Sequence, residues 1–367
     1  MYNIEKIFSK NLKALRKRKG FTQKQFASLL DYSEKAVSKW ETGVNVPSID
    51  VIFKIANALN VTMDELFYDD ERLYYLGVDG GGTKTLFVLT DDKGNEIAEL
   101  ESGPSNPYDI GIEETKKILK ASIYEICKDV NLSSVVVFAG IAGCASGKYK
   151  EELCKFFDEF HFKAAYSGGD SENIIAAGLG NSNGIALIMG TGICAFTVKD
   201  GKSTRTSGWG YLMDKGGSGY NIGRDGLSAA YSDFDKSGEK TWIKELIEKE
   251  TKKKMPELLP DIYSGGKAYI ASFAKIVFEA AEKNDKVAIN IIKQNMEETA
   301  NIIRAAAKPF NEKVKVIIGG GLTKEPELLE YLLNSLADKD KYDIKLLDKR
   351  PVDGALFLAK EKFNKRI

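Results

Sequence analysis

A glycine-rich turn between two strand-like runs constrains this chain more than any other stretch. Residues 77–85 read Gly-Val-Asp-Gly-Gly-Gly-Thr-Lys-Thr, and short apolar runs flank them at 73–76 and 86–89. This pattern predicts a strand–turn–strand. Glycine lacks a Cβ, so the backbone can approach a bound group, and consecutive N–H groups in such a turn converge on an anion. The stretch therefore predicts a hairpin loop that binds the phosphates of a nucleoside triphosphate.

Two better-known phosphate-binding motifs do not fit this stretch. A Walker A loop needs Lys directly after its second glycine and then a helix, but Thr83 follows Gly82 here and a strand comes next. A dinucleotide-binding fingerprint also needs a helix after its glycines. A plain glycine-rich hairpin turn is the alternative. Asp79 ends the first predicted strand, where a magnesium ion would find a hard oxygen ligand.

Length and charge limit the broad class of protein. The 367 residues suggest two or three domains, and Lys+Arg and Asp+Glu balance at 53 each, so charge has to be judged region by region. There is no early apolar signal stretch and no run long enough to span a bilayer. The four cysteines lack metal-type spacing, which predicts a cytoplasmic protein with reduced thiols and no membrane partner. With His161 as the single histidine, general-base chemistry would rely on a carboxylate or a lysine.

The first seventy residues predict a bundle of short helices. Apolar spacing predicts one over 4–19, a capping box at Thr22–Gln25 opens a second, Ser33 caps a third, and further helices begin at Pro47 and Thr62. Two of these helices are joined by a turn of three or four residues, as in a helix-turn-helix. A closer match to a known family is carried by the following residues: Thr22, Gln23, Ala27, Val37, Ser38, Lys39, Trp40, Glu41, Gly43, Pro47, Leu59 and Val61.

With these residues, positions 8–67 resemble the XRE (lambda-repressor/Cro-type) DNA-binding family. The resemblance implies an all-α helix-turn-helix domain over residues 1–69, with the second paired helix in the major groove. By position, the resemblance implies that Gln23 contacts a DNA phosphate. It also implies that Glu34, Lys35 and Lys39 contact base edges. A helical protein-interaction module is the alternative. One such domain covers a single half-site, so DNA binding implies a homodimer. The short polar linker 68–72 would couple it to the rest of the chain.

The glycine pattern returns about a hundred residues later, which suggests an internal duplication. A predicted strand at 185–189 leads into Gly190-Thr191-Gly192 and a second strand at 194–198. Two lobes related in this way would hold a nucleotide's phosphates from both sides. A third cluster, Gly319-Gly320-Gly321, follows a buried strand and would admit a flat adenine. Residues 240–310 predict a helical insert with no candidate chemistry.

Together these stretches resemble the actin/hexokinase/Hsp70 superfamily and, within it, the BadF/BadG/BcrA/BcrD ATPase family that includes N-acetylglucosamine kinases. The match covers about residues 74–363. The motifs that carry it are 77–85, Ser105-Asn106, Gly169-Asp170, Gly190-Thr191-Gly192, Gly208-Trp209-Gly210, Gly217-Ser218 and Gly319-Gly320-Gly321. The resemblance implies an α/β duplicated RNase H-like (actin-like ATPase) two-lobe domain, with an N-terminal lobe at 74–184 and a C-terminal lobe with the helical insert at 185–367.

The resemblance also implies roles for individual residues, with ATP and Mg²⁺ as cofactors and a sugar as substrate. Asp170 would be the catalytic base and Asp79 would hold magnesium. The ATP phosphates and adenine would be bound by Gly80, Gly81, Gly82, Thr83, Lys84, Gly190, Thr191, Gly192, Gly319, Gly320 and Gly321. The sugar would contact Asn106, Asp170, Thr191, Gly208 and Trp209.

One position departs from the family pattern. Where these kinases have Gly-Asp-Glu-Gly-Ser, this chain has Asp214-Lys215-Gly216-Gly217-Ser218, so Lys215 replaces the sugar-contacting Asp. An ammonium cannot accept hydrogen bonds from hydroxyls. Either the ligand carries an acid group, or Asp214 takes over, or the site senses without turnover. Two functions therefore stay open: an ATP-dependent amino-sugar kinase fused to a DNA-binding domain, and a non-catalytic sugar- or nucleotide-sensing transcriptional regulator.

Overall fold

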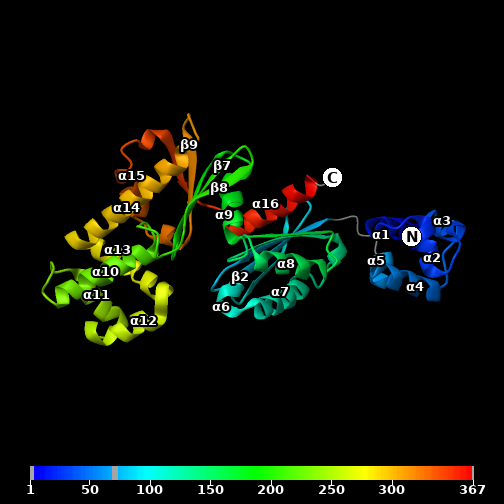
Figure 1. Ribbon diagram of the computed structural model, residues 1–367, viewed down its shortest axis with the longest axis horizontal. Helices are drawn as coiled ribbons and strands as arrows, with labels where there is room; N and C mark the ends of the chain where they lie inside the picture. The colour runs from blue at the N-terminus through cyan, green and yellow to red at the C-terminus, as the bar shows by residue number, and fades with distance from the viewer. Residues whose placement is uncertain (1–3, 68–72, 366–367) are drawn as a thin grey trace. The chain divides into compact units, whose positions relative to one another are not determined.

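The computed structural model describes residues 4–67 and 73–365 (Figure 1). Its contacts divide the chain into two compact units. The first holds residues up to Asp170 together with the chain end from Leu358, and the second is Ser171–Phe357. These bounds differ from the lobe bounds expected from the sequence, because helices α9 and α16 each begin in one unit and end in the other. The linker prediction for 68–72 lies outside the described residues.

Residues 4–67 fold into five helices around one small core, as predicted. The helices are α1 (Ile4–Arg18), α2 (Gln23–Leu30), α3 (Glu34–Glu41), α4 (Ile49–Leu59) and α5 (Met63–Phe67). The capping box forms, since Thr22 Oγ1 accepts from Gln25 N at 3.2 Å and Gln25 Oε1 accepts from Thr22 N at 2.9 Å. Phe8, Phe26 and Val37 are fully buried in the core. This region is the predicted all-α helix-turn-helix domain.

The first sheet contains the predicted glycine hairpin. Its strands are β1 (Tyr74–Gly80), β2 (Thr85–Asp91), β3 (Glu96–Ser102), β4 (Val135–Ile141) and β5 (Ala164–Gly168), in the order β3-β2-β1-β4-β5. β1 pairs antiparallel with β2 across the turn and parallel with β4, and β4 pairs parallel with β5. Because both neighbours of β4 are parallel to it, β1, β4 and β5 all end at the same edge of the sheet.

Helices cover both faces of this sheet. Leu76, Val78 and Phe87 are buried on the face that packs against α7 (Ile112–Ile126) and α8 (Lys148–Asp158). The end of α16 (Pro351–Asn364) lies on the other face. There Lys360 Nζ is 5.0 Å from the centroid of the Tyr75 ring, and the Tyr166 hydroxyl donates to Lys362 O. The buried sheet therefore gives the residues at its carboxyl edge a rigid base.

The second sheet repeats the connectivity of the first. Its strands are β6 (Gly184–Met189), β7 (Ile193–Lys199), β8 (Lys202–Ser207), β9 (Val314–Gly319) and β10 (Tyr342–Leu346), in the order β10-β9-β6-β7-β8. β6 pairs antiparallel with β7 across the second glycine turn and parallel with β9, as β1 does with β2 and β4. The internal duplication inferred from the glycine turns is confirmed in the strand order.

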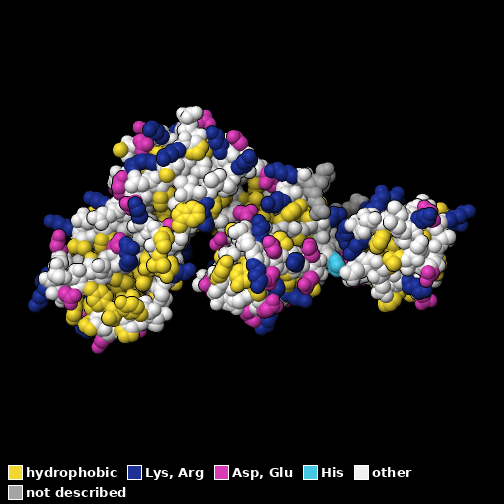
Figure 2. Space-filling view, viewed as in Figure 1, with side chains coloured by type: hydrophobic (Ala, Val, Ile, Leu, Met, Phe, Trp, Pro, Cys, Tyr) yellow, Lys and Arg dark blue, Asp and Glu magenta, His cyan; other side chains and the backbone are white. Residues whose placement is uncertain are grey.

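The second unit also carries the helical insert. The insert contains α11 (Trp242–Thr251), α12 (Met255–Ser272), α13 (Ala274–Glu282) and α14 (Lys286–Ala307), and α10 (Gly219–Phe234) precedes it. Figure 2 shows hydrophobic side chains gathered on the surface of this insert, where Trp242, Leu259 and Tyr263 are exposed. The remaining α-helices of the described residues are α6 (Pro107–Ile110), α9 (Asp170–Leu179) and α15 (Leu328–Ser335). Within the described residues, no helix is both long and apolar enough to cross a membrane.

Candidate functional site

The carboxyl edge of the first sheet gathers the predicted chemistry of the first unit. Gly80 pairs with Ile141 and Gly140 with Gly168, so the glycine turn, the loop after β4 and the start of α9 lie along one edge. Asp79 is the penultimate residue of β1, and Asp170 is the first residue of α9. Burial raises the pKa of the Cys144 thiol, in the loop after β4, to about 12, and the charge of the Asp170 carboxylate adds to the rise. Asp170 is thus close to the other strand ends.

The glycine turn is held by the loops on both sides of it. Gly81 N donates to Lys84 O at 3.0 Å and closes the turn, while Ser105 N donates to Gly81 O at 3.0 Å and Ala142 N to Gly80 O at 2.7 Å. A Cβ on Gly80 would lie 2.3 Å from the Ser105 hydroxyl oxygen, so only glycine fits there. These contacts preorganise the backbone at the position where the sequence predicts phosphate binding.

Lys84 and Asn106 are already engaged by neighbouring carboxylates. Lys84 Nζ lies 2.6 Å from Glu101 Oε2 on β3, and this hydrogen bond, the charge of Glu101 and, more weakly, that of Asp79 raise the pKa of Lys84. The pair is exposed, and exposed pairs are weak enough for an incoming phosphate to open. Asn106 Nδ2 donates to Asp109 Oδ2 at 2.6 Å, and its Oδ1 accepts from Tyr108 N at 3.1 Å. The phosphate and sugar roles of these two residues stay predictions.

The second sheet gathers the other glycine clusters at its own edge. Ile188 pairs with Gly319, so the turn at 190–192 lies beside residues 319–321. Gly190 N donates to Gly192 O at 2.9 Å within the turn, and the start of α10 is tied to it through Tyr220 N, which donates to Thr191 O at 3.1 Å. Thr191 itself is exposed. Like the first turn, this turn joins two antiparallel strands.

A substitution at Gly320 tests how closely the backbone is packed at this edge of the second sheet. The φ of Gly320 is +105°, and a Cβ there would lie 2.3 Å from Met189 O, whereas a Cβ on Gly321 would meet nothing within 4 Å. Gly320→Ala should therefore destabilise the second unit by about 1–3 kcal/mol, the usual cost of such backbone strain. Gly321→Ala is the matched control and should leave the melting temperature nearly unchanged. Differential scanning calorimetry of both full-length variants measures this, and equal melting temperatures would contradict the geometry.

The loop between β8 and α10 carries the predicted sugar residues of the second unit. Gly208, with φ of +97°, packs against Cys194, and Trp209 is 69% exposed. Both carboxylate oxygens of Asp214 accept from this loop, from Trp209 N at 3.1 Å and from Gly210 N at 3.2 Å. Asp214 thus stabilises its own loop, and Lys215 beside it is exposed. The replacement of the family's Asp by Lys215 is not offset by a shift of Asp214 in this structure.

A buried polar network joins helices α1, α2 and α3 of the helix-turn-helix domain. Arg16 donates to Glu41 through Nε and through Nη2, the latter at 2.9 Å, and their side chains are 7% and 1% exposed. The hydrogen bond with Glu41 raises the pKa of Arg16. Gln23 Nε2 also donates to Glu41, at 2.8 Å. The predicted phosphate ligand Gln23 is therefore part of the network, and its contact with DNA stays a prediction.

The predicted base-reading residues are exposed together on α3. Glu34, Lys35 and Lys39 all lie on the solvent side of this helix, opposite the buried Val37 and Trp40. Because residues one turn apart share a helix face, Lys35 and Lys39 form one basic surface. This placement agrees with the expected recognition helix.

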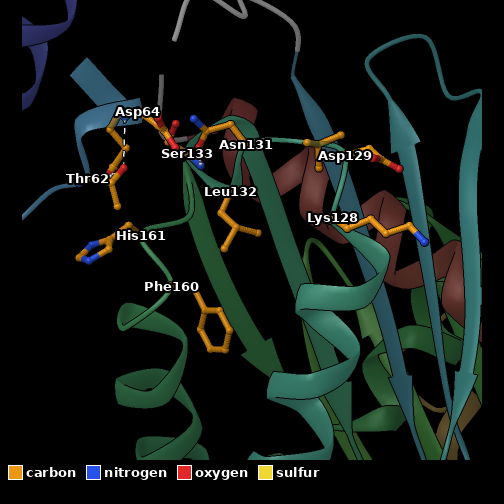
Figure 3. A pocket seen from close by; sticks show the side chains of 11 residues that line it. Thr62, Asp64, Lys128, Asp129, Asn131, Leu132, Ser133, Phe160 and His161 are labelled. Carbon is orange, nitrogen blue, oxygen red and sulfur yellow. Dashed lines mark hydrogen bonds between the residues drawn. The ribbon is translucent and has the colours of Figure 1, made fainter. Parts of the chain in front are cut away.

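A hollow at the opposite edge of the first sheet is separate from this chemistry. Figure 3 shows side chains from the connections that precede β4 and β5, among them Asn131, Phe160 and His161. Asn131 Oδ1 accepts from Ser133 N at 2.9 Å, which shapes the loop. We assign no function to it, since it lies at the amino ends of strands whose carboxyl ends carry the candidate site.

The two sheets with their helices have the actin-like ATPase fold that is also found in sugar kinases, and they follow a helix-turn-helix domain. Residues 76–356 match the BadF/BadG/BcrA/BcrD ATPase family, and residues 12–66 match a helix-turn-helix family. The chain belongs to the BadF/BadG/BcrA/BcrD ATPase family.

Two curated relatives and one solved structure show these similarities. An N-acetylmuramic acid/N-acetylglucosamine kinase of Clostridium acetobutylicum is 32% identical over 261 residues, 68% of this chain and 85% of the relative. The HTH-type transcriptional activator BcrR of Enterococcus faecalis is 39% identical over 66 residues, 18% of this chain and 32% of that protein. A Chromobacterium violaceum structure, named for a proposed N-acetylglucosamine kinase, has a TM-score of 0.64 at 22% identity and covers 78% of this chain and 99% of that one. It shares the fold.

Proposed function

We propose that this protein is an ATP- and Mg²⁺-dependent amino-sugar kinase whose activity or ligand state is coupled to transcription through its DNA-binding domain. The observation that carries the proposal is the meeting of Asp79, the glycine turn and Asp170 at one sheet edge. The duplicated turn in the second unit and the kinase relative from Clostridium acetobutylicum support it.

Each residue has a role that its position suits. Asp170 accepts the proton of the attacking sugar hydroxyl, and a carboxylate suffices because the loose transition state of phosphoryl transfer needs positioning more than strong base. Backbone N–H groups of the glycine turn at 80–82 orient the phosphates. Asn106 presents an N–H to the sugar from a loop tied to the first turn through Ser105.

Asp79 would hold the magnesium ion together with the phosphates of the nucleotide. Among the described residues no three acidic, His or Cys side chains gather into a metal-binding group. A single carboxylate with substrate phosphates and water is a common arrangement for Mg²⁺, which rarely uses a full protein cage. The ion would neutralise charge on the transferring phosphoryl group.

The kinase proposal is tested by ATP consumption. The full-length protein should release ADP from ATP and Mg²⁺ when N-acetylglucosamine, glucosamine or N-acetylmuramic acid is added, and much less without a sugar. No sugar-dependent ADP release across this panel would contradict it.

A non-catalytic sensor is the second candidate function, and Lys215 favours it. Its exposed ammonium stands where the family has a sugar-contacting carboxylate. In this case sugar or nucleotide binding would change DNA affinity without turnover. Ligand-dependent DNA binding together with absent ADP release would select this function over the first.

We also propose that the protein binds DNA as a homodimer, because one helix-turn-helix domain covers a single half-site. Ile49 and Phe53 are one turn apart on α4 and are 77% and 59% exposed. Asp50 and Lys54 flank them on the same helix. Antiparallel packing of two copies of α4 would bury the apolar pair and bring each Asp50 toward the other Lys54, which supports this face as the contact.

Removing a base-reading side chain should relax DNA specificity. After a preferred site is selected from random duplexes, Lys39→Ala should lose about 1–3 kcal/mol of discrimination at one base pair of each half-site, the usual worth of a direct contact. Lys120→Ala removes an exposed positive charge on α7. This variant is the control and should bind the selected site like the wild type. Electrophoretic titration with matched and mismatched duplexes gives the result. An unchanged preference in Lys39→Ala would show that α3 does not read this site.

A further inference from the structure

Asn106 is fixed by a carboxylate that the motifs did not single out. Its side-chain oxygen accepts from Tyr108 N at 3.1 Å, and its Nδ2 donates to Asp109 Oδ2 at 2.6 Å. Both ends of the amide are therefore engaged, and one Nδ2–H is left to donate to a ligand. Asp109 thus sets which way the Asn106 amide faces.

Asp109 also stands directly beside the glycine turn. A Cβ built on Gly82 would lie 3.0 Å from Asp109 Oδ2, and Asp109 N donates to the carbonyl of Asn106, the N-cap of α6, at 3.0 Å. Asp109 is exposed. A carboxylate offers about four lone-pair sites, so the contact with Asn106 leaves it able to accept from a ligand.

We propose, resting on the kinase function above, that Asp109 determines which amino sugars the site accepts. Its charge favours substrates that present a hydroxyl or ammonium group near Asn106 and disfavours those that present a carboxylate there. N-acetylmuramic acid differs from N-acetylglucosamine by a lactyl ether that carries such a carboxylate. Asp109 therefore selects for N-acetylglucosamine and against its acidic counterpart, opposite to the preference that Lys215 alone suggests.

The test uses two substitutions that separate charge from positioning. Asp109→Asn keeps an oxygen that accepts from Asn106 Nδ2 but removes the charge, whereas Asp109→Ala removes both. We measure kcat and KM of the full-length protein for N-acetylglucosamine and N-acetylmuramic acid. Glu114→Gln, which removes an exposed carboxylate paired with Lys117 on α7, is the matched control.

Asp109→Asn should shift the kcat/KM ratio toward N-acetylmuramic acid by about tenfold, as expected when one close like charge is removed. Its KM for N-acetylglucosamine should stay within about threefold of wild type. Asp109→Ala should raise KM for both sugars with a smaller change in kcat, because Asn106 loses its orientation. Glu114→Gln should match the wild type in both values.

An unchanged sugar ratio in Asp109→Asn would overturn the proposal, and so would an Asp109→Ala variant with wild-type KM values. If the wild type phosphorylates neither N-acetylglucosamine nor N-acetylmuramic acid, the sugar preference is measured by binding, and the kinase proposal itself fails only if glucosamine is not phosphorylated either. The same two sugars are then titrated calorimetrically, where Asp109→Asn should shift the Kd ratio by the same factor. No binding of either sugar to the wild type, or an unshifted ratio, would overturn the role of Asp109.

Discussion

Replacing Asp170 by asparagine should lower kcat for sugar phosphorylation by about 10²- to 10⁴-fold, the usual contribution of a general base. Asn keeps the shape of the side chain and is a good residue at a helix start, so the start of α9 should stay intact. Sugar KM should change only a few-fold, because the amide still donates and accepts hydrogen bonds. Steady-state kinetics of the purified variant provide the measurement.

A stability control separates catalysis from folding in this variant. The melting temperature should stay within a few degrees of the wild type, because only the charge near the helix N-terminus is lost. Loss of activity together with a large fall in melting temperature would assign Asp170 a structural role. Activity within threefold of wild type would remove it from the mechanism altogether.

Replacing Glu41 by alanine should unfold the DNA-binding domain and leave the kinase intact. Glu41 is 1% exposed on its side chain and pairs with Arg16, and removing one partner of a buried pair costs about 3–5 kcal/mol because the other charge stays buried. A domain of this size has only a few kcal/mol of stability to lose. DNA binding should be abolished, while the sugar-dependent ATPase rate should be unchanged.

The fluorescence of Trp40 measures the unfolding of the helix-turn-helix domain directly. Trp40 is 5% exposed in the helix-turn-helix core, whereas Trp209 and Trp242 are 69% and 51% exposed, so unfolding of the domain should red-shift the fluorescence through Trp40. Glu5→Ala, an exposed acidic residue on α1, is the control and should change stability by about 0.5 kcal/mol or less. The double variant Arg16→Met with Glu41→Leu should recover much of the fold, because a buried pair replaced by apolar side chains is often tolerated. A Glu41→Ala variant that binds DNA normally would contradict the energetic role of the pair.

Local signals predicted the hairpins and the small helices well, because those elements depend on neighbouring residues. The capping box at Thr22, the glycine turn before Thr85 and its repeat at residues 190–192 all occur as predicted. α10 was not predicted because three glycines lower its helix propensity. Gly223 and Gly226 are there for packing, since a Cβ would lie 2.1 Å from Ile270 O and 2.4 Å from Val277 Cγ2 respectively.

Three predicted residues of the candidate site have partners that the motifs did not include. Gln23 donates to Glu41, Lys84 pairs with Glu101, and Asn106 donates to Asp109. The first two depend on contacts across helices or strands. The third was visible as an Asn-x-x-Asp spacing around Pro107, which is a helix-start signal, but only the coordinates show that it lies beside Gly82.

Transfer of the labelled γ-phosphate of ATP to a sugar tests the central claim most directly. The full-length protein is incubated with γ-labelled ATP, Mg²⁺ and N-acetylglucosamine, and the label in sugar and in free phosphate is counted. We expect one label in the sugar for each ATP consumed, and a loss of this transfer in Asp170→Asn. Label released only as free phosphate, or no ATP consumption with any amino sugar, would contradict the kinase account.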